Sequence, residues 1–448
     1  MRKARPGKRK APTTSAPVPV KKQPRKPRGM VELPPGIVLT DLTKKKWRLG
    51  RLLAWGGFGA LYLASPDSGS PVNETAEHVV KVEPHANGPL FTELAFYQRV
   101  AKPELIKSWC QSRHLKHLGV PMFLGSGSFE HGSRKLRFLV LERFGKDVDE
   151  LFLSNDRKFD VTTVLMLGLR VIDALEYIHC HEYTHGDIKG SNLMMGFSKS
   201  KSGQVYLLDY GLVYRFCPDG NHKEYKEDPK RKHDGTIEFT SRDAHNGVVT
   251  SRRSDLEILG FVMLQWLCDR LPWEKNLQNK EYVKNEKDKY MKNIPKLMRD
   301  CFHDNHQGEV EIQKYLEYIN SLKYEDEPNY EYIRKLFRDG LKKRGCTDDG
   351  KNVNFTKVSS ATADLCNGYN SEEKETRDNA AKRTSPRKRK SEDTSVSPTA
   401  KKSKASPGKK VIASRGRAPS KQQAEAARPR AVRGSQRKPI TVDSATSP

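Results

Sequence analysis

Apolar residues are concentrated in one continuous stretch of this chain, and that stretch limits where a core can form. Helical and strand periodicities recur between residues 37 and 345, whereas residues 1–28 hold 11 Lys and Arg and no acidic residue. Residues 381–448 hold 19 Lys and Arg against four acidic residues. Segments of this composition cannot bury enough surface to offset the entropy lost on ordering. We therefore predict one folded domain at 37–345, a disordered basic arm at 1–36, and an extension with a disordered basic tail at 346–448.

Cysteine usage and hydropathy indicate a soluble protein of a reducing compartment. The seven cysteines are scattered and form no C-x-x-C pair. The basic N-terminus lacks the apolar core of a signal peptide. The longest apolar stretch, Leu256–Cys268, is shorter than the roughly 20 residues that a membrane-spanning helix needs. We expect an intracellular monomer with no membrane partner.

The periodicity changes from strand-like to helical along the predicted domain. Alternating apolar residues at 47–63, broken by a glycine-rich turn, indicate two strands. Beyond residue 158 apolar residues recur every three or four positions, and 255–267 is apolar almost all round, which is typical of a core helix. We predict an α+β fold with a small β-rich lobe at about 37–143 and a larger helical lobe at about 144–345. The other elements expected are a strand at 78–83, a hairpin at 128–142, and helices at 90–100 and 165–178.

Two features of the strand-rich lobe suit the binding of a nucleoside triphosphate. The turn Gly56-Gly57-Phe58-Gly59 lies between strands, so its backbone amides could approach phosphates without interference from a Cβ. An ordinary hairpin turn is the alternative. Lys81 lies in mid-strand, where an inward-facing charge needs a partner, and Glu93 on the following helix is placed to supply it. The alternative is a lysine on a solvated strand face.

A third and a fourth feature follow in the helical lobe. Tyr183–Asn192 comes directly after a long apolar helix and contains Asp187, Lys189 and Asn192 in that order. Phosphoryl transfer needs a carboxylate that orients the attacking hydroxyl, a cation near the γ-phosphate and an amide oxygen for metal, and these three residues supply them. Next, a strand ends at Asp209, an acid that could hold magnesium. Each of these two segments could be a surface turn. The glycine turn, Lys81, the 183–192 segment and Asp209, occurring in this order, nevertheless indicate a phosphotransferase.

The chain resembles a known protein family. It is similar to the eukaryotic protein kinases, which have a two-lobed fold, and more narrowly to the vaccinia-related kinase family within the casein kinase one group. The resemblance covers residues 38 to about 345. The narrow match rests on Asn87–Leu94, His185–Lys189, Asp209–Gly211, Asp234–Ser241 and Ser251–Asp255.

The resemblance implies roles for the residues of the helical lobe. Asp187 would be the catalytic base, with Lys189 and Thr236 flanking it. Asn192 and Asp209 would bind the metal. A lysine two residues after the base is the serine/threonine form of this loop. The expected activity is therefore that of a non-specific serine/threonine protein kinase.

The same resemblance implies a nucleotide site between the two lobes. Lys81 would hold the α- and β-phosphates, paired with Glu93. The backbone of Glu142 and Phe144 would take the adenine edge, and Met194 would pack beneath the ring. Asp255, on the predicted core helix, would brace the catalytic loop. The residues expected to line the phosphate end are Ala54, Gly56, Gly57, Phe58, Gly59 and Leu61.

Three departures from the family pattern have expected consequences. Ala54 replaces the first glycine of G-x-G-x-x-G, and its methyl should restrict the turn and weaken nucleotide binding. Gly186 replaces the arginine that normally receives an activation-loop phosphate, so we predict activity without phosphorylation there. The usual A-P-E is replaced within 241–245, which leaves open how the substrate-binding loop is anchored.

The basic tails predict a nuclear protein. A cytoplasmic pool is also compatible with this composition. Clusters such as Arg387-Lys388-Arg389-Lys390 are of the kind that nuclear import receptors bind, although solubilising charge alone is the alternative. Nearly all of the formal net charge of +27 lies in the tails, so salt-sensitive, nonspecific contact with nucleic acid is expected there. Ser385 and Ser406 each precede proline, and their phosphorylation would weaken this contact; unmodified turns are the alternative.

The resemblance also implies substrates and cofactors. Family members act on nuclear, chromatin-associated proteins such as histones and the barrier-to-autointegration factor, in cell-cycle and chromatin regulation. ATP and magnesium are expected, and manganese is compatible because hard oxygen ligands serve both metals. One rival is a weakly active kinase-fold scaffold held on chromatin by the tails, which Ala54 and Gly186 favour. A small-molecule kinase is disfavoured by Thr236 and Lys189.

Overall fold

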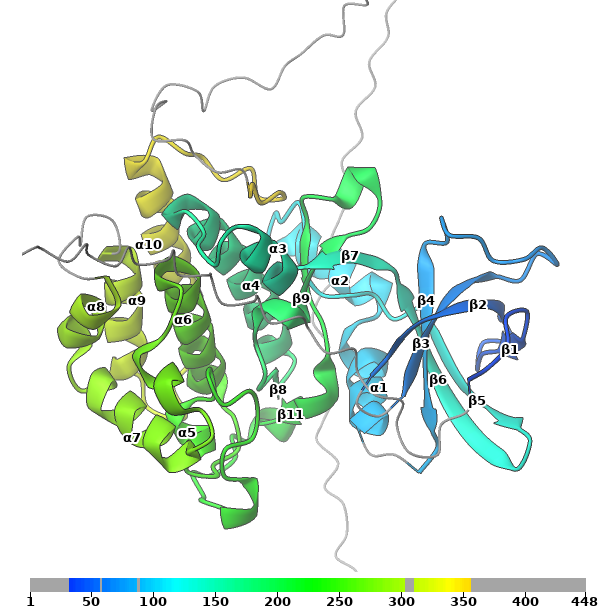
Figure 1. The fold of residues 1–448 in the computed structure, drawn as a ribbon, viewed down its shortest axis with the longest axis horizontal. Coiled ribbons are helices and arrows are strands. Elements are labelled where there is room, and N and C mark those ends of the chain that lie inside the picture. The colour runs from blue at the N-terminus through cyan, green and yellow to red at the C-terminus, as the bar shows by residue number, and fades with distance from the viewer. Residues whose placement is uncertain (1–31, 57–58, 87–88, 303–309, 356–448) are drawn as a thin grey trace, which may run out of the picture. The chain divides into compact units, whose positions relative to one another are not determined.

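The computed structural model describes residues 32–56, 59–86, 89–302 and 310–355, all of which belong to one unit, Met1–Ser371 (Figure 1). Gly57 and Phe58 of the glycine turn lie outside the described residues. So do Asn87 and Gly88 and, apart from a few residues next to the domain, both tails. The predictions about import signals, nucleic-acid contact and tail phosphorylation therefore concern residues outside those described.

The N-terminal lobe is built on an antiparallel sheet. Within the described residues, six strands pair in the order β1-β2-β3-β4-β6-β5. Trp47, Tyr62 and Phe138 have no exposed surface and fill the core of this lobe. The helix α1 lies beside the sheet (Figure 1). The bounds are β1 Val38–Thr40, β2 Lys46–Trp55, β3 Ala60–Pro66, β4 His78–Pro84, α1 Pro89–Val100, α2 Pro103–Ser112, β5 Gly125–His131 and β6 Arg134–Glu142.

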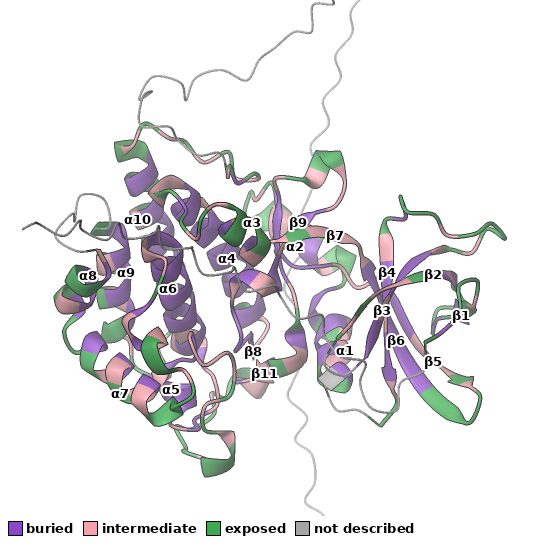
Figure 2. Ribbon diagram, in the orientation of Figure 1, coloured by how far each residue is buried: buried purple, intermediate pink, exposed green. Residues whose placement is uncertain are grey.

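The C-terminal lobe is mainly helical, and α4 and α6 form its centre. Both are buried along almost their whole length (Figure 2). Two small sheets, β10-β9-β7 and β11-β8, lie where the site residues are. In the described part of the chain, no helix has the length and apolar character needed to cross a bilayer. The bounds are β7 Phe144–Asp147, α3 Val148–Ser154, α4 Val161–Cys180, β8 Tyr183–Thr184, β9 Leu193–Gly196, β10 Val205–Leu207, β11 Tyr214–Arg215, α5 Arg242–His245, α6 Arg252–Cys268, α7 Lys280–Met291, α8 Ile294–Phe302, α9 Val310–Ser321 and α10 Tyr330–Lys343.

The two-lobed α+β fold predicted from the periodicity is confirmed. The patterns at 90–100, 165–178 and 255–267 correspond to α1, α4 and α6, and the hairpin at 128–142 to β5 and β6. Periodicity missed the short edge strand β1 and the helix α2. The strand β1 has only three residues, too few for alternation to be read. The helix α2 begins at Pro103, which sequence reasoning treats as a break but which the first turn of a helix tolerates.

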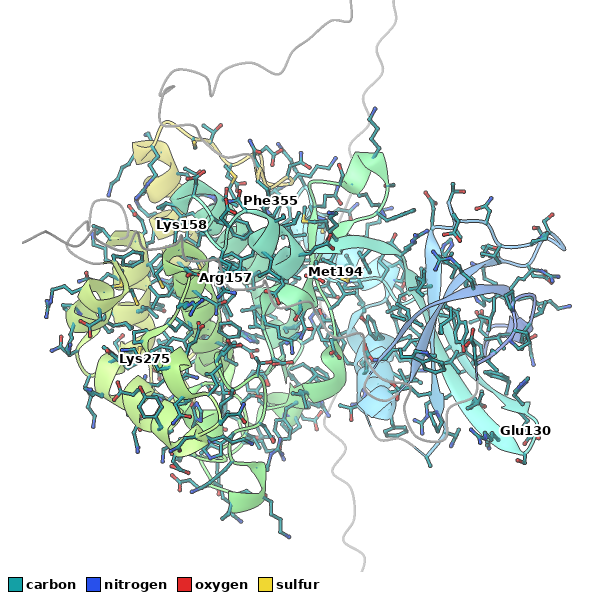
Figure 3. The ribbon with its side chains drawn as sticks, in the orientation of Figure 1. Glu130, Arg157, Lys158, Met194, Lys275 and Phe355 are labelled. Carbon is teal, nitrogen blue, oxygen red and sulfur yellow. The ribbon has the colours of Figure 1, made fainter. Side chains whose placement is uncertain are left out.

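The ordered structure extends beyond both predicted domain boundaries. Leu33, placed by sequence in the disordered arm, is buried, and its N–H donates to the Tyr62 hydroxyl at 3.0 Å. At the other end, Asp348 forms a buried ion pair with Arg170 on α4. Phe355 packs against Phe159 with ring centroids 5.5 Å apart (Figure 3). The boundaries at 37 and 345 were wrong because a few apolar or acidic residues in a polar stretch can be satisfied by partners distant in sequence.

A buried histidine makes the stability of this domain sensitive to acid. His117 is 8% exposed, and its Nε2–H donates to the carbonyl of Val205 at 2.9 Å. Burial lowers the pKa of His117 to about 4, further lowered by Arg170 and partly offset by the hydrogen bond to Val205. The unfolded chain takes up this proton near pH 6.5, so the free energy of unfolding should fall by up to about 3 kcal/mol as the pH drops from 6.5 to 4.

This pH dependence can be measured with the variant His117→Gln, which keeps a side-chain donor but cannot titrate. Thermal unfolding between pH 7 and pH 4 should give a shallower loss of Tm for the variant than for the wild type. Equal slopes in the two proteins would contradict the assignment of this loss to His117.

Candidate active site

Asp187 is the centre of a close cluster of polar side chains. Its Oδ2 accepts a hydrogen bond from Lys189 Nζ at 2.6 Å. Its Oδ1 accepts from the N–H and the Oγ1–H of Thr236, at 2.9 and 2.7 Å. Lys189 Nζ also donates to Thr236 Oγ1 at 2.9 Å, and Asn192 Nδ2 donates to the backbone carbonyl of Asp187 at 2.8 Å. Residues 49 positions apart in sequence thus meet at one carboxylate.

The environment keeps this carboxylate ionised. Burial alone would raise the pKa of Asp187, but the charge and hydrogen bond of Lys189 and the hydroxyl of Thr236 outweigh burial and lower the pKa below its ordinary value. At neutral pH the group is therefore a hydrogen-bond acceptor on both oxygens. A carboxylate of this kind can orient a hydroxyl and receive its proton.

The backbone that precedes Asp187 is fixed by Asp255 of the buried helix α6. Asp255 has no exposed surface, and its carboxylate accepts from the amides of His185 at 2.7 Å and Gly186 at 2.8 Å. It also contacts His179 Nε2 at 2.9 Å. Gly186 has a φ of +79°, a conformation that favours glycine, so the absence of arginine at this position has a backbone reason. The expectation that Asp255 braces this loop agrees with these contacts.

Lys81 and Glu93 meet as the sequence predicted. Lys81 Nζ donates to Glu93 Oε2 at 2.6 Å, which joins β4 to α1. The buried Glu83 lies 3.6 Å from the same ammonium. Burial alone would lower the pKa of Lys81, but the charges of Glu93 and Asp209 outweigh it and raise the pKa above its ordinary value. The ammonium therefore stays charged and available to phosphate oxygens.

A cavity of about 570 Å³ is lined by predicted nucleotide- and metal-binding residues from both lobes, whereas Asp187, Lys189 and Thr236 are not among its lining residues. Glu142 lines this cavity, and its Oε1 accepts from Lys201 Nζ at 2.7 Å. Val79 was missed, although it lies two residues from Lys81 and so shares its strand face. The predicted lining residues present are Ala54, Gly56, Gly59, Leu61, Lys81, Glu93, Glu142, Phe144, Asn192, Met194 and Asp209. Those that sequence reasoning missed include Leu53, Ala60, Val79, Tyr97, Ser191 and Leu208.

The positions of the G-x-G-x-x-G pattern differ in whether the structure requires glycine there. Ala54 lies within β2, paired with Leu61, and has no positive φ. The prediction that the Ala54 methyl restricts the backbone here was therefore wrong, because extended backbone accepts any residue. A Cβ at Gly59 would instead lie 2.3 Å from the carbonyl oxygen of Val82. The Gly56 amide donates to the Gly59 carbonyl at 2.8 Å and closes the turn.

Asn192 and Asp209 are suited to a divalent cation. Both line the cavity that contains Lys81, and Asn192 uses its Nδ2 for Asp187, which leaves its amide oxygen for another partner. Asp209 has a φ of +64° and is the N-cap of the 3₁₀ turn Tyr210–Leu212. One carboxylate and one amide oxygen, completed by phosphate oxygens and water, form a donor set that magnesium accepts.

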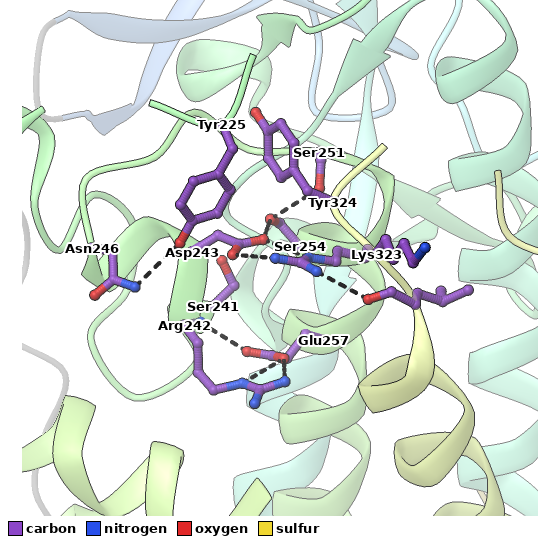
Figure 4. A network of polar contacts seen from close by, with 12 residues as sticks. Tyr225, Ser241, Arg242, Asp243, Asn246, Ser251, Ser254, Glu257, Lys323 and Tyr324 are labelled. Atoms are coloured by element: carbon purple, nitrogen blue, oxygen red, sulfur yellow. Dashed lines mark hydrogen bonds and ion pairs between the residues drawn. The ribbon is translucent and has the colours of Figure 1, made fainter. Parts of the chain in front are cut away.

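The stretch that replaces A-P-E is anchored by two ion pairs to α6. Asp243 accepts from Arg253 at 2.8 and 2.9 Å and from the Ser254 hydroxyl at 3.1 Å. Arg242 donates to Glu257 at 2.7 Å, and Figure 4 shows this pair beside Asp243. The anchoring that the sequence left open is therefore supplied by charge pairs across α5 and α6.

Comparisons with known proteins agree with this geometry. A model of the protein kinase domain matches residues 56–381. The human serine/threonine-protein kinase VRK2 is 48% identical over 68% of this chain. A probable serine/threonine-protein kinase of fowlpox virus, FPV212, is 39% identical over 68% of this chain and 96% of its own length. Nucleosomal histone kinase 1 of Drosophila melanogaster is 39% identical over 70% of this chain.

A solved structure is also similar to this chain. The structure of vaccinia related kinase 3 matches with a TM-score of 0.63 and 31% identity, over 73% of this chain and 98% of that one. The matched stretch spans only 59% of the human relative and 51% of the Drosophila relative. The fowlpox relative, in contrast, is matched over nearly its whole length. The chain therefore belongs to the vaccinia-related kinase family of serine/threonine protein kinases.

Proposed function

We propose that this protein is an active kinase that transfers the γ-phosphate of ATP to Ser or Thr hydroxyls of nuclear, chromatin-associated proteins. The observation that supports this most is the Asp187 cluster, in which base, cation and hydroxyl lie within hydrogen-bond distance of one another. The scaffold alternative rested on Ala54 and Gly186. The backbone accommodates both residues, since Ala54 has no positive φ and Gly186 has a φ of +79°. The assay below distinguishes an active kinase from this scaffold.

In the proposed mechanism a substrate hydroxyl approaches Asp187, which orients it and accepts its proton. Thr236 and Lys189 hold the two carboxylate oxygens in place. Lys189 also lies where it can stabilise charge on the transferred phosphoryl group. Lys81, fixed by Glu93, binds phosphate oxygens of ATP. A magnesium ion, held by Asn192 and Asp209, would neutralise the phosphates when bound.

The proposed substrates include histones and, by family resemblance, the barrier-to-autointegration factor. The name of the Drosophila relative, a nucleosomal histone kinase, supports histones. Basic tails support nuclear import and contact with polyanions. Magnesium is the proposed metal, and manganese is compatible with the same oxygen ligands. The cell-cycle role and the nuclear location are part of this proposal.

The test is transfer of labelled phosphate from magnesium-ATP to core histones by phosphatase-treated protein. The wild type should incorporate phosphate, because Gly186 leaves no arginine that needs a phosphorylated loop. Lys81→Met should reduce transfer at least ~100-fold, because it removes the ammonium that binds phosphate and leaves Glu93 unpaired.

Lys135→Met is the matched control, because this lysine is exposed on the neighbouring strand β6. It should behave as the wild type. ATP binding by the wild type without any transfer to protein would overturn the proposal and favour the scaffold.

A further inference from the structure

The loop at 236–240, which begins with Thr236 beside Asp187, is held by side-chain donors from the C-terminal lobe. Lys287 on α7 donates from Nζ to the carbonyl of Ile237 at 2.9 Å and to that of Thr240 at 2.8 Å. Trp273 Nε1 donates to the carbonyl of Glu238 at 2.8 Å. Three carbonyls of this short loop therefore depend on two side chains that sequence reasoning did not identify.

Lys287 is in an unusual place for a lysine. It has no exposed surface, and no carboxylate among the described residues forms an ion pair with it. Its other neighbours are the ring faces of Phe261 and Trp273, 5.2 and 5.5 Å from Nζ. Burial of a cation is costly, and burial lowers the pKa of Lys287 well below its ordinary value. An apolar side chain would fill this space at lower cost, so the amino group has a purpose other than packing.

A histidine of α5 lies beside the Lys287 amino group. Nζ lies 3.2 Å from Nε2 of His245 on α5, which packs beside α7 (Figure 1). His245 Nδ1 lies 2.8 Å from Nδ1 of His233, and His233 Nε2 lies 3.3 Å from Glu281. The polar contacts of the Lys287 amino group are therefore His245 and the carbonyls of Ile237 and Thr240, so this group links α7 to α5 and to the 236–240 loop.

The loop in turn orders the catalytic cluster. Thr240 donates to the Thr236 carbonyl through both its N–H, at 2.8 Å, and its hydroxyl, at 2.9 Å. Thr236 supplies two of the hydrogen bonds to Asp187. A shift of the carbonyls at 237 and 240 would therefore move the boundary of the space that a protein substrate must enter.

We propose that Lys287 is a positioning residue that holds the 236–240 loop in the conformation that receives the protein substrate beside Asp187. Lys287 does not line the cavity that contains Lys81, Asn192 and Asp209, so its proposed role concerns the protein substrate and not the nucleotide. This role rests on the proposed kinase function, but its structural part can be measured independently of activity.

The first measurement is hydrogen exchange of the full-length protein, comparing wild type, Lys287→Met and Lys289→Met. The methionine at 287 keeps the apolar stem and removes the donor, so the amides of Phe239 and Thr240 should exchange faster by about tenfold or more. Lys289 is exposed on the same helix, so the same change there should leave these amides unaffected. Unchanged exchange in Lys287→Met would overturn the proposal, whether or not the wild type is an active kinase.

The second measurement is kinetic. Lys287→Met should raise KM or lower kcat for a histone substrate, with kcat/KM about 10- to 100-fold lower, while the Kd for ATP stays within about twofold of the wild type. Lys287→Gln, which can still donate to one carbonyl, should lie between the two. A fall in Tm with unchanged kcat/KM would show a merely structural residue and overturn the proposal.

A third variant covers the case in which Lys287→Met does not fold. Trp273→Phe removes the donor to the Glu238 carbonyl and keeps a ring in the core. It should also speed exchange at 236–240 and lower kcat/KM for protein without changing ATP binding. Exchange and kinetics like those of the wild type would contradict the proposal. If instead the wild type transfers no phosphate at all, the proposed function fails, and the exchange result alone decides the role of Lys287.

Discussion

Asp187→Asn should leave a folded protein that binds ATP and transfers almost no phosphate. The amide cannot accept the proton of a substrate hydroxyl, and general-base catalysis contributes typically about 10²–10⁴-fold. The loss should appear in kcat, because Lys81, Glu93 and the cavity that binds nucleotide are untouched. Single-turnover transfer to histones and a nucleotide-binding titration of the same preparation measure the two quantities separately.

The amide also disturbs the cluster, and a control separates that effect. Lys189 Nζ donates to Asp187 Oδ2 at 2.6 Å, so an asparagine NH₂ at this oxygen's position would face another donor. Thr236→Ala removes the hydroxyl that donates to Asp187 but keeps the backbone N–H that donates to the same oxygen, and it should give a smaller loss of kcat. If Asp187→Asn retained more than about a tenth of the wild-type kcat, another residue would be the base.

Asp255→Asn should be the most destabilising single-atom exchange in the helical lobe. The carboxylate accepts from the amides of His185 and Gly186 and contacts His179, all without exposure to solvent. An asparagine has one acceptor oxygen, so its NH₂ must face a backbone N–H. Leaving such buried groups unsatisfied costs about 3–5 kcal/mol in total. We expect Tm to fall by ~5–10 °C and kcat to fall with it, since Gly186 directly precedes the base.

Asp339→Asn provides the matched control for this stability measurement. It makes the same chemical change on the exposed face of α10, where Asp339 pairs with Lys335 at 2.7 Å. Exposed pairs of this kind contribute little to stability because solvent screens them, so its Tm should stay close to that of the wild type. Equal Tm values for the two variants would show that Asp255 does not brace the catalytic loop.

The sequence identified the residues whose chemistry is local. Asp187, Lys189 and Asn192 lie within six positions, and their spacing alone was enough to suggest a base, a cation and a metal ligand. The pairing of Lys81 with Glu93 was predicted because a buried charge in a strand needs a partner and only one helix follows closely. Periodicity located α4 and α6 because both are apolar on nearly every side.

Other features could not be read from the sequence, because their partners are far apart along the chain. Lys287 looks like any lysine of a polar helix, and only the fold shows that its ammonium meets the carbonyls of Ile237 and Thr240. The conformational restriction predicted for Ala54 was wrong because the φ of this residue depends on the pairing of β2 with β3.

By itself, then, the sequence determined the fold class and the order of the catalytic groups, since these depend on periodicity, composition and short spacings. The tertiary structure decided how the substrate-side loop is anchored, which residues complete the nucleotide cavity, and where the ordered chain ends. Each of these depends on hydrogen bonds and packing between distant segments, such as Asp348 with Arg170, and such contacts exist only once the chain has folded.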